Sequence, residues 1–107
     1  MRLVRSNWRT ALLICRKCSK RQHGGFGPKG KTPLAKALKK ELGGKKGRKA
    51  PVGIVEVKCL GVCPRHAVTM VDARHPRDWL LVKPGTPVGE IMEAVGLEEE
   101  DPLVAHS

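Results

Sequence analysis

Two close pairs of cysteines constrain this chain more than any other feature of its sequence. Two residues separate Cys15 from Cys18, three residues separate Cys59 from Cys63, and these four are all the cysteines of the chain. Four thiolates in two pairs are a usual complete ligand set for zinc or for an iron–sulfur cluster. The sequence therefore predicts a fold that brings the two pairs together around a metal centre.

The chain is short and offers little apolar material for a core. It has 107 residues, 40% of them hydrophobic, and its only aromatic residues are Trp8, Phe26 and Trp79. A domain of this size benefits from a covalent or metal staple. We expect a single domain over residues 1–107, with a core at about 8–97, a basic loop at 43–51 and an acidic tail at 98–107.

Nothing in the sequence indicates export or a membrane anchor. The apolar run from Ala11 to Ile14 is too short for a signal peptide, and no stretch approaches the roughly 20 apolar residues of a membrane span. A cytoplasmic location is the resulting prediction. In that reducing compartment, paired cysteines indicate metal binding or redox activity more than structural disulfides.

The net charge of +11 is concentrated in one segment. Between Arg16 and Lys49, thirteen Lys or Arg residues stand against Glu41 alone, so this segment carries +12 and the rest of the chain −1. Such a segment can be a solvated surface, or it can steer an acidic redox partner protein by its field. Nucleic-acid binding is disfavoured, because only Phe26 could stack on bases within the segment and no base-reading motif is present.

The apolar pattern predicts a strand, a helix and a second strand. The first strand covers Trp8 to Ile14 and ends directly at Cys15. Thr32 is the expected N-cap of the helix, with Pro33 in its first turn, and Gly43 stops it. The second strand, residues 53–58, runs into Cys59 as the first runs into Cys15.

A hairpin and a last helix complete the predicted order. Strands at 67–71 and 79–82 form the hairpin, with Trp79 in the core, and the helix covers 87–95 with Thr86 as its cap. If the first two strands are parallel with a right-handed crossover, their carboxyl ends lie at the same end of the sheet. The prediction is an α/β fold with a central sheet of about four strands and two main helices, in which the cysteine pairs meet.

At this point the chain resembles the thioredoxin-like [2Fe-2S] ferredoxins and related small predicted metal-binding domains. The resemblance covers roughly residues 8–97, and its most specific part is the segment Val57-Lys58-Cys59-Leu60-Gly61-Val62-Cys63-Pro64. It implies a thioredoxin-like ferredoxin fold and a one-electron carrier that is not itself an enzyme. It also implies a [2Fe-2S] cluster held by Cys15, Cys59, Cys63 and a cysteine of the loop after the first strand, for which Cys18 is the only candidate. Members of the family can be homodimers.

Two other readings of the cysteines remain open. A zinc-stabilised binding module for nucleic acid or an acidic protein could use all four thiolates. Zinc ribbons, however, usually separate their pairs by about 15–20 residues, whereas forty residues lie between Cys18 and Cys59 here. A thiol–disulfide oxidoreductase could use Cys15 as nucleophile and Cys18 as resolving thiol, but it leaves the second pair without a role.

The remaining motifs predict no further chemistry. Residues 25–32 match the G-x-x-x-x-G-K-[ST] pattern of a phosphate-binding loop, but no strand directly precedes them, as that loop requires. The carboxylates form no pair suited to acid–base catalysis. The four histidines are interpreted as surface residues: His23, His66, His75 and His106. His66 lies three residues after Cys63 and could replace a cysteine as a ligand, but four cysteines make this unnecessary.

Overall fold

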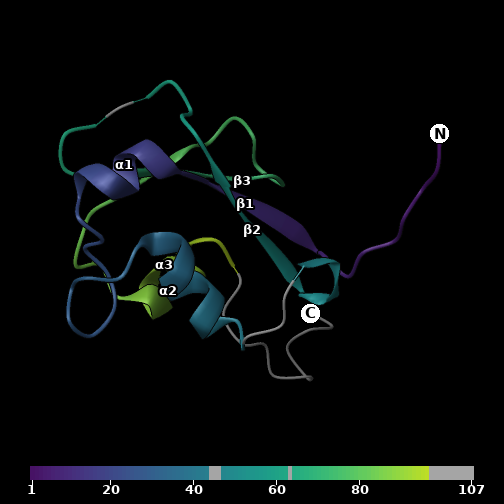
Figure 1. Ribbon diagram of the computed structural model, residues 1–107, viewed down its shortest axis with the longest axis horizontal. Coiled ribbons are helices and arrows are strands. Elements are labelled where there is room, and N and C mark those ends of the chain that lie inside the picture. The colour runs from purple at the N-terminus through teal and green to yellow at the C-terminus, as the bar shows by residue number, and fades with distance from the viewer. Residues whose placement is uncertain (44–46, 63, 97–107) are drawn as a thin grey trace.

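The computed structural model describes residues 1–43, 47–62 and 64–96. Over these ranges the chain forms a mixed α/β structure with a four-stranded sheet and three α-helices (Figure 1). The elements follow in the order β1 (Thr10–Cys15), α1 (Arg16–Arg21), α2 (Leu34–Glu41), the 3-10 turn η1 (Gly47–Lys49), β2 (Val52–Val57), β3 (Val68–Asp72), β4 (Leu80–Val82) and α3 (Val88–Ala94). The α/β class is confirmed, and none of the described helices is long and apolar enough to cross a membrane.

The sheet has the strand order β2-β1-β3-β4, so β1 is central and β2 forms one edge. β1 and β2 are parallel, with Thr10 opposite Val52 and Cys15 opposite Val57. β3 runs antiparallel to both β1 and β4, as the predicted hairpin requires. Because β1 and β2 are parallel and in register, both strands end at the same end of the sheet.

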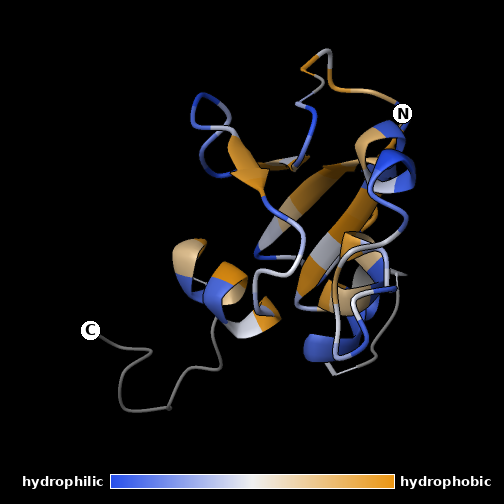
Figure 2. Cartoon of the chain, turned by 90° about the vertical axis from the view of Figure 1, so that its left-hand side faces the viewer, coloured by the Kyte–Doolittle hydropathy of each residue, from blue (hydrophilic) through white to orange (hydrophobic). Residues whose placement is uncertain are grey.

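One face of the sheet carries the core. Leu12 and Ile14 of β1 and Met70 of β3 point to this face, where α2 and α3 pack side by side (Figure 1). Alternation along β1 leaves Ala11 and Leu13 on the opposite face, where they are only half-buried. Hydrophobic residues follow the strands and hydrophilic residues the exposed parts of the helices (Figure 2), so the core is one layer between the sheet and two helices.

Both long helices begin one residue later than the sequence predicts. Pro33 and Pro87 take extended conformations and occupy the N-cap positions without a side-chain cap. Thr32 lies outside α2, because its C=O accepts from the N–H of Phe26, and the first bond of the helix runs from Ala37 to Pro33 instead. The hydroxyl of Thr86 instead donates to the carbonyl of Lys83 at 2.6 Å.

Two further expectations are wrong. Cys15 and Cys18 do not lead into a loop, because α1 starts immediately after Cys15; its sequence, RKCSKR, lacks the apolar periodicity by which a helix is recognised. Trp79 is not a core residue: 42% of its surface is exposed, and its indole Nε1 donates to the carbonyl of Pro76 in the turn before β4.

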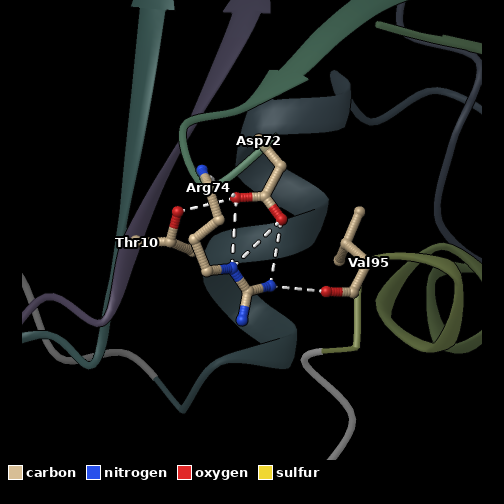
Figure 3. A network of polar contacts seen from close by, with 4 residues as sticks. All are labelled: Thr10, Asp72, Arg74 and Val95. Atoms are coloured by element: carbon tan, nitrogen blue, oxygen red, sulfur yellow. Dashed lines mark hydrogen bonds and ion pairs between the residues drawn. The ribbon is translucent and has the colours of Figure 1, made fainter. Parts of the chain in front are cut away.

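A buried carboxylate joins the end of α3 to the sheet (Figure 3). Asp72 accepts a hydrogen bond from the Thr10 hydroxyl at 2.6 Å and is paired with the Arg74 guanidinium at 2.9 Å. The same guanidinium donates to the carbonyl of Val95 at 2.6 Å. Burial raises the pKa of Asp72, but the hydrogen bonds from Arg74 and Thr10 outweigh it and hold that pKa below its usual value.

We expect Asp72 to make stability depend on pH. Since its pKa is lower in the folded chain than in the unfolded one, its contribution is complete above the unfolded value, about 3.9, and is lost as the pH falls through the folded value. Asp72→Asn should lower the free energy of unfolding at pH 7 by about 1–2 kcal/mol and flatten its pH dependence below about pH 4. Urea unfolding between pH 3 and 7 measures both effects, and an unchanged pH profile in the variant would show that Asp72 is not the group responsible.

Candidate metal centre

The candidate centre lies where β1 and β2 end. Cys15 is the last residue of β1, and Cys59 follows the end of β2 by two residues. The backbone N–H of Lys17 in α1 donates to the carbonyl of Lys58 at 3.3 Å. This bond ties the segment after β1 to the segment after β2, so the structure brings the two cysteine-bearing segments together at one end of the sheet.

Cys15 is fully buried, and backbone donors surround its sulfur. The N–H of Cys18 approaches Sγ of Cys15 at 3.5 Å and so caps the first turn of α1. Burial raises the pKa of the Cys15 thiol. The N–H groups of Cys18, Leu60 and Lys17, together with the Cys18 side chain, lower it by a larger amount. The pKa of Cys15 therefore lies below the usual value for cysteine, which favours the thiolate that binds metal.

Cys18 is equally buried, but its surroundings favour the protonated thiol. Its thiol faces two oxygens, the carbonyl of Val62 at 3.8 Å and the hydroxyl of Thr69 at 3.9 Å. Burial raises the pKa of Cys18, contacts with Thr69 partly offset this, and the neighbouring Cys15 raises it again, so the net pKa lies above the usual value. Cys15 and Cys18 thus lie in contact, with the pKa of Cys15 lowered and that of Cys18 raised.

The second cysteine segment is more open. Cys59 is exposed, and its sulfur accepts a hydrogen bond from the N–H of Gly61 at 3.3 Å. Gly61 takes the left-handed conformation, with φ of +85°, which bends the chain around this sulfur. Cys63 lies outside the described residues, so its predicted role as a ligand is neither supported nor opposed by the geometry.

The donor set fits a thiolate-bound metal centre by its chemistry. Two buried sulfurs in contact, a third sulfur on the adjoining segment, and N–H groups directed at Cys15 and Cys59 are features that suit iron–sulfur ligation. Within residues 1–43, 47–62 and 64–96, no three Cys, His, Asp or Glu side chains are grouped closely enough to hold a metal ion. Cys59 would therefore have to turn towards Cys15 when a metal binds.

Basic side chains surround this end of the sheet. Six exposed Lys or Arg residues lie on α1 and on the segments beside Cys59 and Cys63: Arg16, Lys17, Lys20, Arg21, Lys58 and Arg65. The remaining positive charge of the 16–49 segment includes Lys36, Lys39 and Lys40 on the outer side of α2. The structure therefore divides the basic segment between the cysteine end of the sheet and the outer side of α2.

Two contributors to the site were not found from the sequence. Thr69 is fully buried in β3, and its hydroxyl, which also donates to the carbonyl of Val62 at 3.0 Å, fixes the loop beside Cys18. The N–H of Leu60 acts on Cys15 from the other cysteine segment. Neither residue type signals such a role, because both roles depend on contacts between segments far apart in the sequence.

Several backbone N–H groups of the phosphate-loop pattern at residues 25–32 are already hydrogen-bonded within the loop. The N–H groups of Gly25 and Gly30 donate to carbonyls within the same loop, as do those of Phe26 and Thr32. These amides are therefore occupied, and α1 rather than a strand precedes the loop. His23, His66 and His75 are exposed, as predicted, and His106 lies outside the described residues.

Comparison of the chain with protein-family models, with curated protein sequences and with solved structures gives no match. The case for a function therefore depends on the residues themselves.

We expect the described cysteines to differ sharply in their reaction with iodoacetamide. In the metal-free, reduced protein, exposed Cys59 should be labelled at least about tenfold faster than buried Cys15 and Cys18, because reaction requires access as well as thiolate. Peptide mass spectrometry after timed labelling distinguishes the sites. Equal rates at Cys15 and Cys59 would contradict the burial of Cys15.

Proposed function

We propose that the chain binds a [2Fe-2S] cluster through Cys15, Cys18, Cys59 and Cys63 and serves as a one-electron carrier. The observation that carries the proposal is the in-register parallel pairing of β1 and β2. Each of these strands is followed by a cysteine segment, and the Lys17–Lys58 hydrogen bond joins the two segments. Four thiolates arranged as two pairs supply one pair per iron. A reducing, cytoplasmic location is part of the proposal, because the thiols must stay free to bind metal.

We further propose that the fold is that of the thioredoxin-like ferredoxins. The proposal is supported by the element order, in which a strand–helix–strand unit is followed by an antiparallel hairpin and a helix. It is also supported by the sheet order β2-β1-β3-β4 with β1 and β2 parallel. Helix α1 and the 3-10 turn η1 are additions within the first crossover.

When bound, the cluster would supply the change of one electron, and the chain would set the conditions for that change. Backbone N–H groups on the sulfurs of Cys15 and Cys59 stabilise negative charge on them. The buried side of the site, formed by Cys15, Cys18 and Thr69, excludes water, while Cys59 lies at the surface where a partner can approach. The positive side chains around the site favour the reduced, more negative state.

The proposed partner is an acidic redox protein. The exposed Lys and Arg residues of α1, with Lys58 and Arg65, form a positive surface around Cys59, and such a surface raises the rate of encounter with a negative partner. The rate of electron transfer to an acidic acceptor should therefore fall as salt is added, since exposed charges are screened over about 8 Å at 0.15 M.

The test is an anaerobic visible spectrum combined with analysis of iron, zinc and acid-labile sulfide on the same sample. We expect charge-transfer bands with about two irons and two sulfides per chain, and bleaching on reduction with dithionite. A colourless protein with about one zinc per chain would overturn the carrier and make the cysteines a structural site.

One observation favours a second candidate, a thiol–disulfide oxidoreductase. Cys15 has a lowered pKa and lies in contact with Cys18, as a nucleophile and its resolving thiol would. Both sulfurs are buried, however, which hinders attack on a protein disulfide. Reduction of insulin disulfides by the metal-free protein with dithiothreitol would support this candidate, and a rate equal to that of a Cys15→Ser variant would reject it.

A further inference from the structure

A groove runs along the outer edge of β2, beside α2. It has a volume of about 770 Å³ and is lined by residues of α2, of β2 and by Trp8. All five residues from 52 to 56 line it, and successive residues of a strand point to opposite faces of the sheet. A groove lined by β2 residues that point to both faces of the sheet must lie beside the strand edge. We refer to it as the β2 groove.

The two walls of the β2 groove differ in chemistry. Lys36, Lys39 and Lys40 of α2 form one wall, and all three are exposed. Trp8 forms the other wall: its indole Nε1 donates to the carbonyl of Gly47 at 2.8 Å, and its ring lies against Gly53. A Cβ atom on residue 53 would come within 2.5 Å of the ring, so the glycine is what allows the ring to lie flat on the strand.

The base of the β2 groove presents apolar side chains and backbone. Val52, Ile54 and Val55 are buried or half-buried, and β2 is the last strand on its side of the sheet formed by the described residues. Its outer edge therefore offers N–H and C=O groups that no described strand pairs with. Among the described lining residues, Glu56, at the end nearer the cysteines, is the only acidic one, so together with the three lysines these residues carry a charge of +2.

We propose that the β2 groove binds an extended, acidic segment of a partner protein, which adds to the sheet as a strand beside β2. Backbone hydrogen bonds to a free strand edge supply affinity in this mode, and pockets for alternate side chains supply specificity. Apolar side chains of the segment would lie against Trp8 and Val55 on one face of the sheet, and its carboxylates, on the other face, would meet the lysines of α2. The proposal stands apart from the metal centre and holds whichever metal the cysteines bind.

A nucleic acid is the competing occupant, because Trp8 could stack on a base and the lysines could bind phosphate. The strand edge and the apolar base favour the peptide, since a nucleotide would leave the edge N–H and C=O groups without partners. Glu56 also opposes a continuous run of phosphates along the groove, whereas a peptide can place an uncharged side chain beside it.

The probe is a fluorescein-labelled ten-residue peptide in which glutamate alternates with valine, titrated with the full-length protein and followed by anisotropy. We expect saturable binding that Lys36→Glu with Lys39→Glu weakens by about tenfold or more, because two attractive contacts become repulsive. The matched control is Lys29→Glu with Lys31→Glu, which changes the net charge equally at exposed positions outside the groove and should alter affinity by less than about twofold.

A second peptide with N-methyl groups on alternate residues tests the strand addition itself. It keeps every charge but loses the N–H donors of one edge, and we expect it to bind about tenfold more weakly. Equal binding of the methylated peptide, or equal effects of the two lysine pairs, would overturn the proposal. Oligo-deoxythymidine is the competitor, and the Trp79→Phe variant leaves Trp8 as the fluorescent tryptophan. If the oligonucleotide displaces the peptide and fully quenches Trp8 at a lower concentration than the peptide requires for binding, the groove is assigned to nucleic acid instead.

The chain's own acidic run is the remaining alternative and needs its own variant. Glu98→Gln, Glu99→Gln and Glu100→Gln in one full-length chain remove three negative charges. If the peptide binds the parent chain and this variant alike, the groove is open to a partner, as proposed. If only the variant binds, the occupant is the chain's own acidic run, and the partner proposal is overturned.

Discussion

Replacing Cys59 with serine should abolish the visible absorption of the protein as reconstituted with iron and sulfide. Cys59 is the one described cysteine at the surface, and no described His, Asp or Glu is placed to substitute for it. An alkoxide is a poorer ligand for iron than a thiolate, so we expect cluster content to fall about tenfold or more. Cys15→Ser should do the same, because Cys15 receives more backbone donors than any other described sulfur.

His66→Ala is the matched control for the cysteine variants. His66 is exposed and lies within seven residues of Cys59, yet it is not a proposed ligand. The control should leave the spectrum and the iron and sulfide content unchanged. Full absorption in Cys59→Ser would remove Cys59 from the ligand set, and loss of absorption in His66→Ala would require a mixed site.

Truncating Phe26 should destabilise the fold more than any other single change outside the cysteines. Phe26 is fully buried in the core, although it lies in the loop between α1 and α2. We expect Phe26→Ala to lower the free energy of unfolding by about 3–5 kcal/mol, a large part of the 5–15 kcal/mol typical of a small domain. Urea unfolding followed by far-UV circular dichroism measures this loss.

The loop around Phe26 cannot collapse easily to fill the resulting cavity. Phe26 pairs with Thr32 by two backbone hydrogen bonds, and Gly24, at φ of +89°, lies directly against the carbonyl of Lys31. Phe26→Leu should cost less than about 1.5 kcal/mol because it keeps most of the volume. Trp79→Phe, at an exposed position, should change stability by less than about 0.5 kcal/mol. A cost below about 1 kcal/mol for Phe26→Ala would show that the loop does not form part of the core.

The strands and the long helices could be predicted from the sequence because each has a local signal. The β-branched run at 53–58 and the Leu34–Leu42 spacing correspond to β2 and α2 with shifts of one residue or so. Thr32 and Thr86 were wrong as caps, because a tertiary pairing in one case and a turn in the other use their polar groups. Helix α1 has no apolar stripe, and it is stabilised instead by the burial of Cys18 and Ser19 and by the cap that the Cys15 sulfur provides.

The candidate site could be predicted in its location but not in its surroundings. Parallel strands that each end beside a cysteine were sufficient to place Cys15 and the Cys59 segment at one end of the sheet. The contacts of Thr69 and Leu60 with the sulfurs depend on how β3 and the second cysteine segment pack, which no local pattern records. The same holds for Trp8, which the sequence predicts in a strand and which instead lies against Gly53 of β2, on the wall of the groove opposite the lysines of α2.

Electron paramagnetic resonance during a redox titration of the reconstituted protein tests whether the cysteines hold a reversible one-electron centre. The oxidised protein should be silent, and reduction should produce a signal of about one unpaired spin per chain that disappears on reoxidation without loss of iron. Absence of the signal in protein that holds about one zinc per chain, or release of iron on the first reduction, would show that the cysteines hold no reversible one-electron centre.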